Sequence, residues 1–99
     1  MPDPSNQNAI TDVAATYQAL VSDDVIRATS GTFTVTLPAA SSCFAGQEIT
    51  VMNVNSGSIT VAGAGSDTIL GTATLAQNKV TKFIRVTTGT GAWVAFIGG

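Results

Sequence analysis

The sequence contains no histidine and only one cysteine, Cys43. Without histidine there is no thiolate and imidazole pair for nucleophilic catalysis, and no zinc site of ordinary composition. A single cysteine cannot form an internal disulfide, so the fold must be stable without that cross-link. No pair of opposed carboxylates stands out either, and we therefore expect no enzyme, no metal ion and no cofactor.

Charge is scarce as well. Charged residues make up 10% of the chain, whereas a soluble domain usually carries about a quarter. Four Lys and Arg residues, the first of them Arg27, stand against six Asp and Glu residues, for a net charge of -2. Binding to nucleic acid needs a basic stripe that neutralises phosphates, so nucleic acid is not an expected partner.

Long hydrophobic runs are also missing. No apolar run approaches the roughly 18 residues of a membrane span. The start, MPDPSNQNAI, lacks the basic and apolar regions of a secretory signal. We expect no membrane insertion and no export by a standard signal pathway.

The residues that are present describe one small domain. The chain has 99 residues, of which 44% are apolar, and a mean hydropathy of +0.35. A domain of this size buries only about 60 to 65% of its unfolded surface and is marginal alone. Surplus apolar surface at such low charge favours self-association.

Residues 1–16 are predicted to form a polar N-terminal arm, followed by a β domain over residues 17–99. Pro2 and Pro4 forbid an early helix. The spacing of Ile10, Val13 and Ala14 allows one helical turn within residues 11–20, but not a stable helix.

From Tyr17 onward, short runs rich in Val, Ile, Thr and Phe recur every eight to twelve residues between turn residues, which is typical of an all-β domain. The clearest run is Thr32 to Leu37, whose alternation places Phe33, Val35 and Leu37 on one face. The other predicted strands are Val25 to Ala28, Gln47 to Val54, Ser58 to Val61, Thr68 to Leu70, Thr74 to Ala76, Lys79 to Thr87 and Ala92 to Ile97.

Two turns are predicted to join neighbouring strands as hairpins. One is Asn55-Ser56-Gly57-Ser58, with Gly57 at positive φ, and the other is Gly89-Thr90-Gly91. In the last strand, Trp93, Ala95 and Ile97 alternate with Val94 and Phe96, so both faces are apolar. One face would meet the chain's own core and the other a neighbouring subunit or sheet.

The stretch Gly63-Ala64-Gly65-Ser66-Asp67-Thr68-Ile69 is similar to one turn of a calcium-binding nonapeptide repeat. That motif needs stacked copies, and no second copy exists here. We favour a tight turn in which Asp67 caps backbone amides before a buried Ile69.

The remaining charged residues read as surface features. Asp23 and Asp24 are expected in a solvated turn, and Glu48 in a cross-strand pair with Lys79, Lys82 or Arg85. These three cations are split between the two faces of one strand, so no focused anion site follows. They are expected to guard an edge strand.

Three further side chains are given structural roles. Cys43 is expected to be a small buried hydrophobe. Tyr17 and Trp93 would suit a sugar-stacking surface, but core or interface packing is the favoured interpretation because they lie far apart in sequence.

The stretch from Tyr17 to Phe96 resembles a small β domain of tailed-phage virion proteins, found at fibre tips and in head fibres or decoration proteins. The motifs that carry the resemblance are Asp24-Val25-Ile26-Arg27-Ala28-Thr29-Ser30-Gly31, Thr34-Val35-Thr36-Leu37-Pro38-Ala39-Ala40, Ala45 to Val61, Gly65 to Ile69 and Thr88 to Val94. The resemblance implies an antiparallel β domain, sandwich-like or jelly-roll-like, that assembles as a trimer around a three-fold axis and has no enzyme activity.

The expected function is that of a capsid decoration or head-fibre protein, because the chain starts at Met1 without a fibrous shaft. The expected partners are two further copies in a homotrimer and the major capsid protein, at the outer surface of the virion. The capsid-binding arm residues are Pro2, Asp3, Pro4, Asn6, Gln7, Asn8, Ile10 and Val13, and the trimer interface residues are Trp93, Phe96 and Val94. The alternative is a tail-fibre tip that binds a host-cell receptor.

Overall fold

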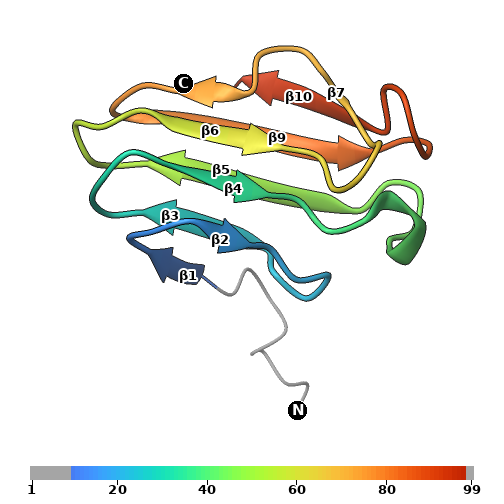
Figure 1. Ribbon diagram of the computed structural model, residues 1–99, viewed down its shortest axis with the longest axis horizontal. Helices are drawn as coiled ribbons and strands as arrows, with labels where there is room; N and C mark the ends of the chain where they lie inside the picture. The colour runs from blue at the N-terminus through green and yellow to red at the C-terminus, as the bar shows by residue number, and fades with distance from the viewer. Residues whose placement is uncertain (1–9, 98–99) are drawn as a thin grey trace.

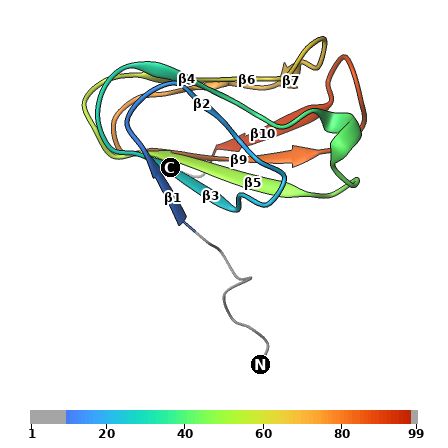
Figure 2. The same cartoon turned by 60° about the horizontal axis from the view of Figure 1, so that its bottom comes forward.

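A computed structural model describes residues 10–97 as two β-sheets packed face to face (Figures 1 and 2). One sheet has six strands in the order β1-β3-β5-β9-β10-β7, and the other has four in the order β2-β4-β6-β8. The elements are β1 (Ile10–Val13), β2 (Tyr17–Gln18), β3 (Val25–Ala28), β4 (Phe33–Thr36), the 3-10 helix η2 (Ala40–Ser42), β5 (Glu48–Asn53), β6 (Ile59–Ala62), β7 (Ile69–Leu70), β8 (Thr74–Leu75), β9 (Lys79–Arg85) and β10 (Trp93–Ile97). The all-β class is confirmed.

The sheets are mixed, whereas the expected arrangement was antiparallel. From β1 to β8 the chain alternates between the sheets, and in each sheet the odd or the even strands become neighbours. Two successive crossings return the chain in its original direction, so β1, β3 and β5 run parallel, as do β2, β4 and β6. Antiparallel pairing occurs where β9 lies between β5 and β10, and where β8 joins β6.

The core fills the space between the sheets. Strand alternation directs Ile26, Val51 and Phe83 inward from the larger sheet, and Val35 and Ile59 inward from the smaller one. All five are fully buried. The alternation predicted for residues 32–37 is confirmed, since Leu37 is also fully buried and Phe33 packs partly buried against this core.

The boundary expected after residue 16 is also corrected. Residues Ile10–Val13 form β1, which pairs with β3 in register and begins the larger sheet. Val13 is 9% exposed and belongs to the core, and no helical turn forms in this segment. Local spacing missed β1 because it is held by ladder bonds to residues about fifteen positions away.

The loop after β5 is not a hairpin. It carries the chain from the larger sheet to β6 in the smaller one. Asn53 and Asn55 hold it: Asn53 Nδ2 donates to Gly57 O (2.6 Å), and Gly57 N donates to Asn55 Oδ1 (2.6 Å). Gly57 does not have the expected positive φ. Its role is close approach, since a Cβ here would overlap the Gly31 carbonyl oxygen. The turn at Gly89 does join an antiparallel pair, β9 and β10, as expected.

Candidate binding surfaces

The outer face of the larger sheet carries an apolar patch along one side. Register places Ile84 of β9, Val94 of β10 and Leu70 of β7 in one row across the strands. Phe96 lies two residues further along β10 on the same face. Leu70 is 63% exposed and Phe96 52% exposed, while Ile84 and Val94 are half-buried. We call these four residues the apolar edge patch.

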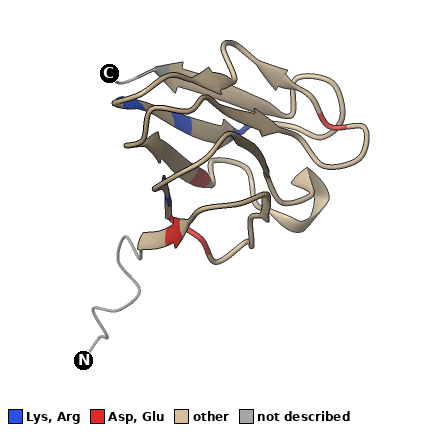
Figure 3. Ribbon diagram, turned by 60° about the vertical axis from the view of Figure 1, so that its left-hand side comes forward, with Lys and Arg blue, Asp and Glu red and all other residues tan. Residues whose placement is uncertain are grey.

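Charged side chains on this outer face neutralise one another. Arg27 Nε and Nη2 donate to the two carboxylate oxygens of Asp12, each at 2.8 Å, across β3 and β1. This hydrogen bond lowers the pKa of Asp12 and raises that of Arg27. Lys82 of β9 lies 3.5 Å from Glu48 of β5, as one of the expected cross-strand pairs. Among the described residues this face carries the ion pairs Arg27–Asp12 and Lys82–Glu48, and Figure 3 shows how sparse charged residues are on the ribbon.

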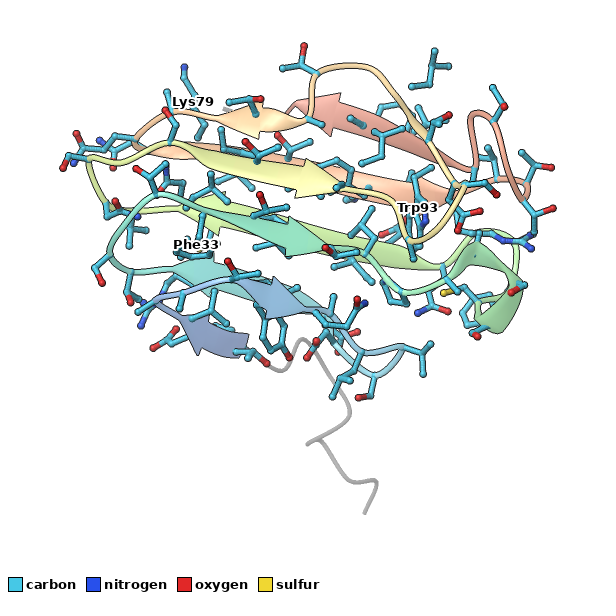
Figure 4. The ribbon with its side chains drawn as sticks, viewed as in Figure 1. Phe33, Lys79 and Trp93 are labelled. Carbon is cyan, nitrogen blue, oxygen red and sulfur yellow. The ribbon has the colours of Figure 1, made fainter. Side chains whose placement is uncertain are left out.

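The prediction that Trp93 lies in the trimer interface is wrong. It is fully buried between the sheets, so a second copy cannot reach it. Figure 4 shows Trp93 and Phe33 toward opposite ends of the sandwich. Trp93 Nε1 is also a buried donor without a partner in the described part of the chain. Val94 and Phe96 lie on the outer face, where contact with a second copy remains a prediction.

The expected capsid-binding arm is only partly covered by the structure. Pro2, Asp3, Pro4, Asn6, Gln7 and Asn8 lie outside the described residues. Of the other two, Ile10 is 60% exposed at the start of β1, whereas Val13 is a core residue and is not available to a capsid.

Asp23 is buried, and the solvated turn expected for it is wrong. The residue is 7% exposed, and its carboxylate accepts hydrogen bonds from Tyr17 OH (2.8 Å), Leu20 N (2.8 Å) and Thr11 Oγ1 (3.1 Å). Burial and the bond to Asp23 raise the pKa of Tyr17 to about 12. Three satisfied donors give Asp23 a structural role in joining β1, β2 and the turn before β3.

The carboxylate of Asp67 accepts hydrogen bonds from backbone amides, as expected, but these amides belong to loops that are distant in sequence. Its Oδ2 accepts from Ala40 N (2.8 Å) and its Oδ1 from Gly89 N (3.0 Å). Ile69 is half-buried, not fully buried. Within residues 10–97, no group of three or more His, Cys, Asp or Glu side chains is placed to hold a metal ion.

The expectation that cations guard an edge strand is wrong. Strand β9 is central, between β5 and β10. Lys82 points outward to Glu48, while Arg85 Nε donates to Ala40 O (3.0 Å) at the end of the sandwich. Cys43 next to this contact is half-buried against the core, and burial raises the pKa of its thiol.

Two features were missed by sequence reasoning. Leu70 and Ile84 join Val94 only through strand register, which a linear pattern does not contain. A surface hollow of about 350 Å³ also opens where β3 and β5 begin. The exposed aromatic ring of Phe44 at its rim was the one signal available in sequence, as a Phe within a polar, glycine-containing loop.

In the described part of the chain, no helix is long and apolar enough to cross a membrane. Comparison with protein-family models, with curated proteins and with solved structures gave no match for this chain.

Proposed function

We propose that this chain is a structural protein of a tailed-phage virion, a capsid decoration or head-fibre protein that assembles as a homotrimer and binds the major capsid protein. The ordered motifs from Asp24 to Val94 support the family, as a resemblance. The observation that carries the assembly is the apolar edge patch, which is exposed on the outer face of the larger sheet beside the paired Lys82.

Burial of the apolar edge patch is the driving force for assembly. Transfer of a half-exposed Leu, Ile, Val or Phe side chain out of water contributes about 1 kcal/mol. Three copies that turn this patch toward a common axis would bury it three times over. Because the nearest cation, Lys82, is paired with Glu48 of its own chain, it enters the contact without an unpaired charge.

Attachment to the capsid is assigned to the residues before β1. They include Pro2, Pro4 and Asn6 of the expected arm and lead into Ile10 at the sheet edge. A trimer supplies three such segments, and multivalent binding raises the apparent affinity without any new contact. If the protein binds the assembled shell and not the free capsid protein, binding stabilises the shell by linkage.

The assembly is tested by light scattering on the full chain. We expect a mass three times 10.0 kDa, and a monomer for Val94→Asp, whose charge would be buried in the contact. Thr60→Asp is the matched control, because Thr60 is exposed on the smaller sheet, and it should remain trimeric. A wild-type monomer, or a trimeric Val94→Asp variant, would contradict the proposed contact.

Capsid binding is tested by co-sedimentation with capsids that lack the protein. The full chain should pellet with capsids, and a chain starting at Ile10 should stay in the supernatant with its trimer mass unchanged. Equal pelleting of both forms would remove the attachment role of residues 1–9.

The hollow beside Phe44 favours a second candidate, a fibre tip that attaches the virion to a host-cell receptor. The labelled protein would then bind susceptible cells and fail to saturate capsids. Capsid saturation without cell binding would exclude this candidate.

A further inference from the structure

The hollow lies over the start of β3 and β5, and it borders the apolar edge patch where Glu48 pairs in register with Ile84. Its volume of about 350 Å³ falls at the lower end of small-molecule sites, which span about 300–1,000 Å³. Phe44, Gln47, Glu48, Asp24 and Thr50 contribute to its wall. This size suits one or two sugar rings and not a larger cofactor.

Phe44 gives the hollow an aromatic platform. Its side chain is 69% exposed, the highest value among the large apolar residues that the structure describes. Its ring adds little to the core, so folding alone does not account for a phenylalanine in this loop. An aromatic face is electronegative and attracts the C–H groups of a ring that stacks on it.

Gln47 gives the hollow a fixed acceptor. The residue is 8% exposed, and its Nε2 donates to Val21 O at 2.8 Å. Only the amino group can donate to a carbonyl, so the orientation of the amide is set and Oε1 is the atom left over. No donor to that oxygen is found among residues 10–97, and Gln47 is one of the residues that line the hollow.

The charge of the wall selects the ligand class. Asp24 and Glu48 are acidic, and none of the residues that line the hollow is cationic. Glu48 remains half-exposed although it pairs with Lys82. A wall of acceptors favours a ligand that donates hydrogen bonds, and it offers no cation to pair with a carboxylate, sulfate or phosphate.

We infer that the hollow binds a neutral hexose unit of a glycan, with the ring stacked on Phe44 and its hydroxyl groups donating to Gln47 Oε1 and to Glu48. The inference does not depend on the proposed trimer, since Phe44 and Gln47 precede β5 and are not part of the apolar edge patch, although Glu48 pairs in register with Ile84 of that patch. It is a non-covalent site, and no side chain in it is assigned a chemical step.

The test is an NMR titration of the full-length, ¹⁵N-labelled protein. The probes are the methyl glycosides of glucose, galactose and mannose, with N-acetylglucosamine, each to about 50 mM, so that a Kd of about 1 mM or weaker can be measured. We expect at least one sugar to shift the Gln47 side-chain amide and the Gly46 backbone amide. Sialic acid, which is anionic, should shift neither.

Phe44→Ala should weaken binding of that sugar at least tenfold, with an unchanged spectrum elsewhere because the ring is exposed. Val54→Ala, which truncates an exposed apolar side chain just after the far end of β5 and outside both surfaces, should bind like the wild type. No shift with any of the four sugars, equal binding by Phe44→Ala, or equal shifts with sialic acid would overturn the inference.

The two proposals fail separately. Phe44→Ala should keep the trimer mass and capsid binding, whereas Val94→Asp should lose the trimer and keep the sugar-induced shifts. Loss of sugar binding in Val94→Asp would show that the hollow needs a second copy, and it would contradict the independence of the site.

Discussion

At the scale of single residues, the hydrogen bond between Tyr17 and the buried carboxylate of Asp23 makes the stability of the fold depend on pH in the alkaline range. Burial and the hydrogen bond to Asp23 raise the pKa of Tyr17 from 10.0 to about 12. The folded state therefore favours the neutral phenol. Its contribution to stability is fully present below pH 10 and is lost as the pH rises through about 12.

This makes a prediction for Tyr17→Phe. The variant should be less stable by about 1 kcal/mol at neutral pH, the usual contribution of one hydrogen bond. The difference in unfolding free energy between wild type and variant should shrink above pH 10. Urea unfolding across this pH range checks it, and ultraviolet titration of the chain's single tyrosine gives the pKa directly. A difference that does not change with pH would contradict the shifted pKa.

Trp93 carries the second prediction at this scale. Because its Nε1 has no partner in the described structure, Trp93→Phe removes an unsatisfied donor together with part of a ring. We expect a loss of about 1–2 kcal/mol, set by the cavity alone, against about 3–5 kcal/mol for Trp93→Ala. Urea denaturation measures both. Equal losses would show that the indole N–H is bonded after all, for example to an internal water.

At the scale of elements, sequence reasoning located the strands from β3 onward, missed β1 and β2, and missed how the strands pair. Alternation over residues 32–37 and the apolar runs in β5 and β9 are local, so β4, β5 and β9 were found where predicted. Pairing is not local. The Asn55 loop looks like a hairpin in sequence, yet it connects two sheets, and parallel neighbours arise only after two such crossings.

Gly57 shows what one crossing requires. The residue packs on the connection between β3 and β4, where an added Cβ would overlap Gly31 O and lie 2.6 Å from Thr32 Oγ1. Gly57→Ala should therefore destabilise the fold by about 1–3 kcal/mol, as overpacking does. Ser56→Ala, at an exposed position of the same loop, should be neutral within about 0.5 kcal/mol. Thermal unfolding of both variants measures the two losses. Equal stability of Gly57→Ala and the wild type would show that close packing between the two loops does not require glycine at position 57.

At the scale of the whole molecule, composition pointed to surplus apolar surface without saying where it lies. The last strand was correctly identified as apolar on both faces, but Trp93 was placed on the interface although it fills the core. Only the register of β7, β9 and β10 shows which side chains share the outer face with Val94. The hollow depends on loops from β3 and β5 that are distant in sequence, which is why it was not predicted.

The same arrangement predicts how the assembly responds to salt. Both ion pairs on the outer face, Asp12 with Arg27 and Glu48 with Lys82, lie within one chain. If burial of the apolar edge patch drives trimer formation, added salt has no intermolecular attraction to screen. The mass from sedimentation equilibrium should then stay constant between about 0.05 and 0.5 M NaCl, a range over which the Debye length falls about threefold. A trimer that dissociates as salt rises would instead be held by charged groups. The contact would then have to lie on another surface than the apolar edge patch.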